Sequence, residues 1–162
     1  MNSLILSTAT RVLAPILFFF SLYILWRGHN DPGGGFIGGL VAATALALIE
    51  KASGLAAAKR MLRVEPLAIA AAGLGCACVS AVWGAIAKGY VLAGVWPLLS
   101  VGADGKKEGL PVGSILLFDT GVYLVVVGGV AGMLFALEAA AQAAQPDAPD
   151  ASAEVTPEKE AE

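Results

Sequence analysis

Long apolar stretches, interrupted by short polar segments, dominate the chain. Four of them are close to the roughly 20 residues that a helix needs to cross a bilayer at about 1.5 Å per residue. They run from about Leu4 to Trp26, Gly34 to Lys51, Pro66 to Ala87 and Val112 to Leu137. The pattern therefore predicts an all-α integral membrane protein with about four transmembrane helices.

The segments outside these stretches differ in character. The third connection, Gly89 to Pro111, is long and contains Asp104-Gly105, a dipeptide typical of tight turns, so we expect a small hairpin or a re-entrant flap there. Residues 142–162 are mostly Ala, Pro, Asp and Glu, which cannot bury enough apolar surface to offset the entropy of ordering. We predict a transmembrane domain, residues 1–141, followed by a disordered acidic tail, residues 142–162.

Composition and charge narrow the function classes. Only 14% of the residues are charged and the mean hydropathy is +0.77, which leaves little room for a soluble catalytic domain. The net charge of −3 comes from the acidic tail, and no clustered basic face is available to neutralise phosphates. A nucleic-acid partner is therefore excluded, whereas the lipid bilayer is an expected partner.

The distribution of basic residues predicts the orientation in the membrane. The loop from Lys51 to Glu65 holds the densest cluster of Lys and Arg. Four spans place this loop on the same side as both termini, and the positive-inside rule assigns that side to the cytoplasm. We expect a multi-pass protein of the cell inner (plasma) membrane with both termini in the cytoplasm.

A glycine-rich segment joins the first two apolar stretches. Within it, Gly34 and Gly38, and likewise Gly35 and Gly39, have the four-residue spacing that lets another helix approach closely. Two interpretations stay open, because the glycines could pack inside this one bundle or against other polypeptides.

Two ionisable residues are candidates for a role in ion or proton movement. His29 lies near a predicted helix end, where an imidazole suits proton exchange; the alternative is a hydrogen-bonded turn residue. Asp119 lies roughly 10 Å into the last predicted helix, a depth at which an unpaired carboxylate costs several kcal/mol. Its alternative role is a helix-end carboxylate bonded to first-turn amides or to a nearby lysine.

The remaining polar side chains suggest no enzymatic chemistry. Glu50 and Glu138 are interpreted as interfacial anchors, and Tyr123 as a member of the aromatic belt. Cys76 and Cys78 point to different sides of one predicted helix and are interpreted as small core residues. We found no pattern typical of a nucleophile, a metal cluster or a phosphate loop, so we expect no enzyme, no metal and no cofactor.

Two segments together resemble a known family. Residues 28–40 and 114–124 are similar to the MnhB component of the multisubunit Mrp-type cation/proton antiporters, and the resemblance covers roughly residues 1–138. It implies a subunit that works only with other Mrp-type membrane subunits, in an assembly that exchanges Na+ for H+ under the proton-motive force. On this basis the candidates for the ion path or coupling are His29 and Asp119. The candidates for subunit packing are Pro32, Gly33, Gly34, Gly35, Phe36, Gly38 and Gly39.

Two other functions stay open at this point. The chain could be a scaffold subunit of a related redox-linked complex, such as a membrane-bound hydrogenase or a complex-I-like enzyme. It could also form a small channel as a homo-oligomer, although the predicted helices lack a polar stripe to line a pore.

Overall fold

The computed structural model describes residues 4–28, 34–97, 99–101, 107–109 and 112–144. These residues form the helices and strands α1 (Leu4–Arg27), α2 (Gly34–Ser53), α3 (Leu55–Leu62), α4 (Pro66–Lys88), β1 (Leu99–Val101), β2 (Lys107–Gly109) and α5 (Ser114–Ala144). Four helical stretches are long and apolar enough to cross a membrane, the third of them comprising α3 and α4. The predicted helical membrane fold is confirmed.

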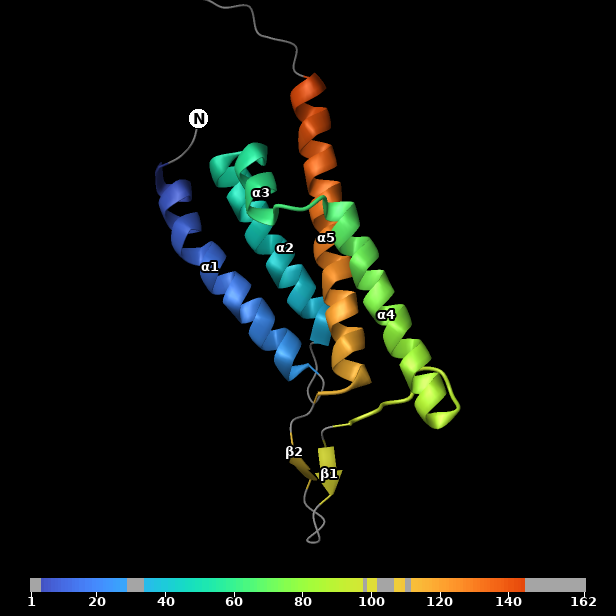
Figure 1. Cartoon of the computed structure of the whole chain (residues 1–162). Helices are drawn as coiled ribbons and strands as arrows, with labels where there is room; N and C mark the ends of the chain where they lie inside the picture. Colours follow the sequence, from blue (N-terminus) through green and yellow to red (C-terminus); the bar gives the residue numbers. More distant parts are fainter. Residues whose placement is uncertain (1–3, 29–33, 98, 102–106, 110–111, 145–162) are drawn as a thin grey trace, which may run out of the picture.

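The four long helices lie side by side in a row, in the order α1, α2, α5, α4 (Figure 1). Helix α5 packs along both α4 and α2, and α2 packs along α1, whereas α1 touches α5 only slightly. Among the described residues, the outer helices α1 and α4 make no substantial contact with each other. A row of this kind does not close around an interior, so this chain alone does not enclose a pore.

The outer helices leave most of their surface uncovered. Large apolar side chains such as Phe19 of α1 and Ile86 of α4 are 71% and 82% exposed. In α2, by contrast, half of the most apolar window is buried inside the chain. The exposed faces of α1 and α4 are therefore available to lipid or to other membrane proteins.

Small residues bring α4 and α5 close together. A Cβ atom added to Gly121 would lie 2.7 Å from the carbonyl oxygen of Gly73, and one added to Gly128 would overlap the carbonyl oxygen of Pro66. One added to the neighbouring Gly129 would meet nothing within 4 Å. The two backbones are thus in contact along one face of α5, as is common where small residues line helix interfaces in membranes.

Helix α3 was not predicted, because the segment from Lys51 to Glu65 was interpreted as a loop. Gly54, with φ of +85°, separates α3 from α2, and Arg63 ends it in the left-handed conformation, its N–H bonding the Lys59 carbonyl at 3.1 Å. The helix is strongly amphipathic, with Ala58 fully buried against the core. A helix of two turns is held by this packing rather than by its own propensity, which is why the sequence pattern did not reveal it.

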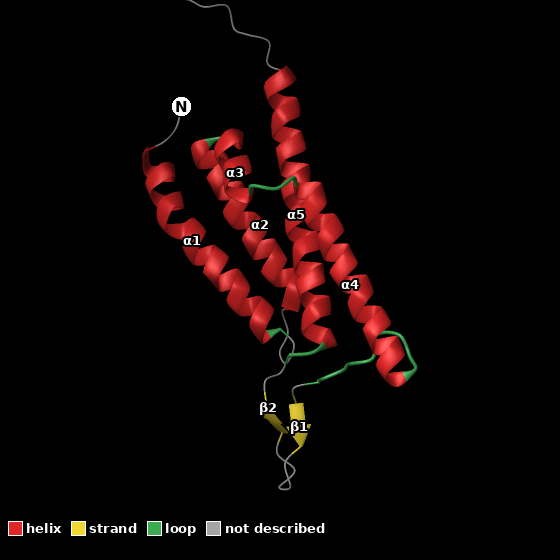
Figure 2. Cartoon of the chain, in the orientation of Figure 1, coloured by secondary structure: helices red, strands yellow, loops and turns green. Residues whose placement is uncertain are grey.

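The predicted hairpin is present at the opposite end of the row from α3 (Figure 2). Strands β1 and β2 pair antiparallel, with Ser100 opposite Glu108. Helix α5 continues to Ala144, beyond the predicted end of the transmembrane domain at residue 141. The predicted disordered tail otherwise falls on residues 145–162, which lie outside the described part of the chain.

Candidate functional site at the two ends of helix α2

Asp119 of α5 lies against the first turn of α2. A Cβ atom on Gly34 would lie 3.3 and 3.4 Å from the two carboxylate oxygens of Asp119, and one on Gly35 would overlap the Asp119 carbonyl oxygen. The first amide groups of a helix have no partner within that helix, and the helix dipole favours a negative charge beside them. The carboxylate therefore occupies a position that stabilises it, at the start of a neighbouring helix rather than of its own.

Some of the candidate residues next to this contact belong to the described part of the chain and some do not. His29, Pro32 and Gly33 lie outside the described residues. Gly34 begins α2 with φ of +62°, a conformation that strains residues with a side chain. The role of Asp119 in ion movement, like that of His29, stays a prediction.

The other candidate glycines contact helices of the same chain. A Cβ on Gly38 would lie 2.9 Å from the carbonyl oxygen of Ser21 in α1, and one on Gly39 would lie 2.8 Å from the Cβ of Val126 in α5. This geometry supports the interpretation of packing within the chain for this face of α2. Phe36 lies on the uncovered side and is 57% exposed, so its contact with another subunit stays a prediction.

A buried hydrogen bond joins α1 to α5 one turn beyond Asp119. The Ser21 hydroxyl donates to the Phe18 carbonyl oxygen at 2.6 Å, so in its 3.0 Å bond with Tyr123 the phenolic hydroxyl is the donor. Tyr123 is only 7% exposed, and its assignment to the aromatic belt is therefore wrong. The reason is Gly38, whose missing side chain leaves room for the tyrosine ring between the helices.

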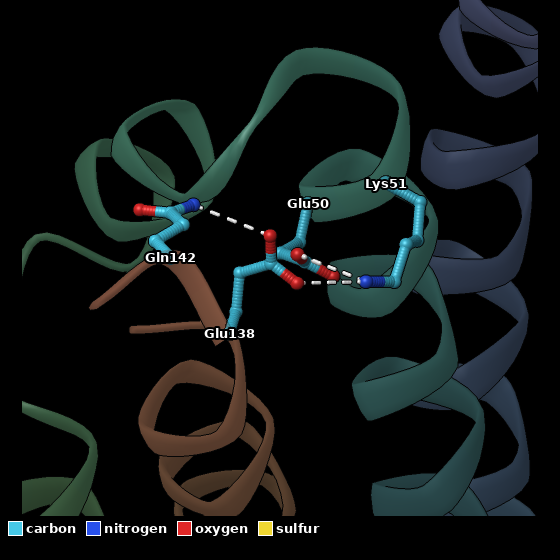
Figure 3. Close-up of polar contacts among 4 residues, drawn as sticks. All are labelled: Glu50, Lys51, Glu138 and Gln142. Atoms are coloured by element: carbon cyan, nitrogen blue, oxygen red, sulfur yellow. Dashed lines mark hydrogen bonds and ion pairs between the residues drawn. The ribbon is translucent and has the colours of Figure 1, made fainter. Parts of the chain in front are cut away.

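A second polar cluster lies at the other end of α2 (Figure 3). Lys51 donates to Glu138 of α5 at 2.9 Å and to Glu50 at 3.4 Å, and Gln142 donates to Glu138 at 3.2 Å. Glu50 is 3% exposed, so its interpretation as an interfacial anchor is wrong. Its side chain lies on the face of α2 that packs against the other helices, and the adjacent Lys51 neutralises it.

We expect Lys51→Met to lower the amount of assembled protein in the membrane several-fold, because it leaves the buried Glu50 without its counterion. The double variant Lys51→Met with Glu50→Gln should recover most of that amount. Quantitative blotting of membranes measures both. Lys59→Met, which removes an exposed lysine of α3 with no ion pair among the described residues, is the matched control. Equal amounts of the single and double variants would contradict the counterion role.

The two polar clusters are separated by an apolar middle. From Gly34 to Glu50 the helix rises by roughly 24 Å, and the buried side chains between its glycines and Glu50 are alanines and Leu46. Among the described residues, no group of three or more His, Cys, Asp or Glu side chains could hold a metal ion. Cys76 is half-buried and Cys78 is exposed, so the latter is not the core residue expected.

A serine cluster that the sequence pattern did not reveal fixes the third connection to the helices. Ser114, the first residue of α5, accepts from the Val95 amide at 2.9 Å and donates to the Ala93 carbonyl oxygen at 3.0 Å. Ser80 of α4 donates to the Ser114 carbonyl oxygen at 2.5 Å. Serine before an apolar run is a helix-cap signal, but it does not reveal which loop will pack there.

Residues 5–132 match the family model described as a domain related to the MnhB subunit of Na+/H+ antiporter. The chain belongs to the MnhB family. The resemblance seen in the two sequence segments is thereby confirmed.

Individual MnhB relatives agree with this assignment. The chain is 37% identical to the Na(+)/H(+) antiporter protein of this type from Bacillus subtilis (strain 168) over 127 residues, 78% of this chain and 87% of the relative. It is 35% identical to the protein of the same name from Alkalihalophilus pseudofirmus, over 78% of this chain and 86% of the relative. These relatives are matched over nearly their whole length.

A solved structure shows the same arrangement of helices. The chain is similar to part of the structure of the Mrp complex from Dietzia sp. DQ12-45-1b, with a TM-score of 0.69 and 31% identity over 83% of this chain. It spans only 14% of the length of the chain that it matches there. In that complex, the MnhB-like part is thus one section of a much longer polypeptide.

Proposed function

We propose that this MnhB-family chain is a non-autonomous membrane subunit of a multisubunit Na+/H+ antiporter driven by the proton-motive force. Its partners are other Mrp-type membrane subunits, and Na+ and H+ are the transported ions. The observation that carries the proposal is the family match over residues 5–132, together with relatives that are named as subunits of a Na+/H+ antiporter. The relatives name no redox-linked complex, so the scaffold alternative is not favoured.

The geometry supports a subunit that depends on partners. The helices form an open row, and the polar clusters at the two ends of α2 are separated by apolar side chains. An ion crossing the membrane needs continuous polar contacts, which the described part of this chain does not supply. Surfaces of neighbouring subunits therefore complete the path, and the exposed faces of α1 and α4 are where those subunits or lipid pack.

The distribution of charge supports an orientation with both termini in the cytoplasm. The start of α1, helix α3 and the end of α5 all lie at one end of the row (Figure 1). This end carries the exposed basic residues of the α2–α4 connection, Lys51, Lys59, Arg60 and Arg63. By the positive-inside rule it faces the cytoplasm, and the hairpin faces outward.

Co-purification tests the proposed function. A tag placed after Ala144 should, after mild detergent extraction, recover several hydrophobic proteins related to proton-pumping subunits. Everted vesicles from a strain lacking this chain should lose Na+-dependent proton exchange and regain it when the chain is restored. Recovery of hydrogenase or iron-sulfur proteins would instead indicate a redox-linked complex, and sodium flux through the chain alone in liposomes would indicate a small channel.

A further inference from the structure

An open cavity of about 290 Å³ lies between α1, α2 and α3, away from both polar clusters described above. Its wall has a polar part, formed by a guanidinium and hydroxyl groups, and an apolar part. The residues that matter for its chemistry are Ser7, Thr10, Arg11, Pro15, Ser53 and Met61. Both chemistries in one open cavity suit an amphipathic ligand.

Arg11 supplies a positive charge that no acidic side chain neutralises in the described part of the structure. No carboxylate there lies within 4 Å of it, and the ion pairs at this end of the row are those of Lys51 with Glu50 and Glu138. Arg11 and Arg27 are 16 residues apart on α1, which corresponds to roughly 24 Å against a hydrocarbon thickness of about 30 Å. With Arg27 at one boundary, the Arg11 side chain reaches the level of the lipid headgroups on the α3 side.

Two neighbours of Arg11 affect the polar groups that face this cavity. Thr10 is 5% exposed and its hydroxyl has no hydrogen-bond partner, although a helical threonine can bond the carbonyl one turn earlier. Rotation about χ1 exchanges this hydroxyl with the methyl group, which gives it access to the cavity that Thr10 lines. Pro15 has no N–H, so it leaves the Arg11 carbonyl without its helical hydrogen bond and favours a bend in α1 at the cavity.

The combination selects the chemistry of the occupant. An arginine beside hydroxyl groups offers donors to an anion, and a guanidinium matches phosphate oxygens well. Met61 and Pro15 offer an apolar wall to an acyl chain. The exposed Lys59 and Arg60 of α3 add positive charge at the same end of the row and favour a ligand with a net negative charge.

We propose that this cavity is a binding site for an anionic phospholipid, with its phosphodiester held by Arg11 and the hydroxyls of Ser7, Thr10 and Ser53. The acyl chain lies along Met61 and Pro15. A lipid bound there fills the space between α1 and α2 and joins the outer helix to the rest of the row.

Photo-labelling of the full chain in its native membrane assembly tests this site. The assembly is placed in vesicles containing a phosphatidylglycerol that carries a diazirine in its acyl chain, and the labelled peptides are mapped. We expect label on α1 and α3 around the cavity, competed by phosphatidylglycerol but not by phosphatidylcholine or inorganic phosphate. Arg11→Gln should reduce this label about tenfold, as expected when a charge-assisted hydrogen bond is lost.

Two further variants keep the test specific. Met61→Trp narrows the cavity without changing its charge and should also reduce the label, whereas Arg60→Gln removes an exposed charge at the same end and should leave it unchanged. Equal labelling of the wild type and Arg11→Gln would overturn the proposal. So would competition by inorganic phosphate, which indicates a free-anion site, or a cross-link from position 61 to another subunit, which indicates a protein occupant.

Discussion

Replacing Gly35 by alanine is expected to abolish stable assembly of the protein in the membrane. The added Cβ would overlap the backbone carbonyl oxygen of Asp119, and its next neighbour, the Tyr123 amide nitrogen, would be 2.9 Å away. A backbone atom cannot move aside as a flexible side chain can, so α2 and α5 must separate along their shared face. Overpacking of this kind costs roughly 3 kcal/mol or more, enough to remove most of the folded protein.

The measurement is the amount of chain recovered in a monodisperse membrane complex after mild extraction. Gly129→Ala is the matched control, because a Cβ at that position of α5 meets nothing within 4 Å and alanine favours a helix over glycine. Recovery of Gly35→Ala at the level of Gly129→Ala would mean that α2 and α5 are not in close contact in the membrane.

The sequence predicts the membrane spans well because their signal is local and strong. A helix that crosses a bilayer must be apolar over its full length, so the start of α1 at Leu4 and the start of α4 at Pro66 appear directly in the pattern. The hairpin was also predicted, because Asp104-Gly105 is a local turn signal. Helix α3 was missed because eight residues held by tertiary packing of Ala58 leave too short a pattern.

The order of the helices in the row could not be predicted from hydropathy. All four spans are apolar on nearly every face, so periodicity does not distinguish a buried face from one that contacts lipid. The glycine spacing showed that α2 could approach another helix, but not that α1 and α5 of the same chain are the helices it meets. This is also why Tyr123 and Glu50 were assigned to the interface, although both face other helices.

Part of the candidate site followed from simple rules and part did not. A carboxylate well inside an apolar helix attracts attention by its cost, so Asp119 was identified from its position alone. Its neighbour at the start of α2 could not be identified, because residues 34 and 119 are far apart in the chain. The structure brings them together, and the contact raises the question whether Asp119 only stabilises the helix end or also exchanges protons.

Asp119→Asn is expected to lower Na+/H+ exchange in everted vesicles by about tenfold or more while leaving assembly largely intact. Asparagine keeps the size of the side chain and an oxygen that accepts hydrogen bonds from the first turn of α2, so the packing at Gly34 and Gly35 is preserved. It cannot release a proton, and a group that transfers protons contributes on the order of a hundredfold or more. Loss of the helix-dipole attraction costs only about 0.3–1 kcal/mol at an exposed site, and up to about 2 kcal/mol when partly buried.

The comparison with Asp119→Ala separates the two roles of the carboxylate. Alanine removes both the charge and the acceptor beside α2, so it should reduce the amount of assembled complex as well as exchange, whereas asparagine should reduce exchange per assembled complex only. Exchange per complex that is normal in Asp119→Asn, with assembly lost in Asp119→Ala, would show that Asp119 stabilises the start of α2 and takes no part in proton movement. Because the α2 contact is satisfied by either an acid or an amide, only a role in proton transfer requires the acid itself.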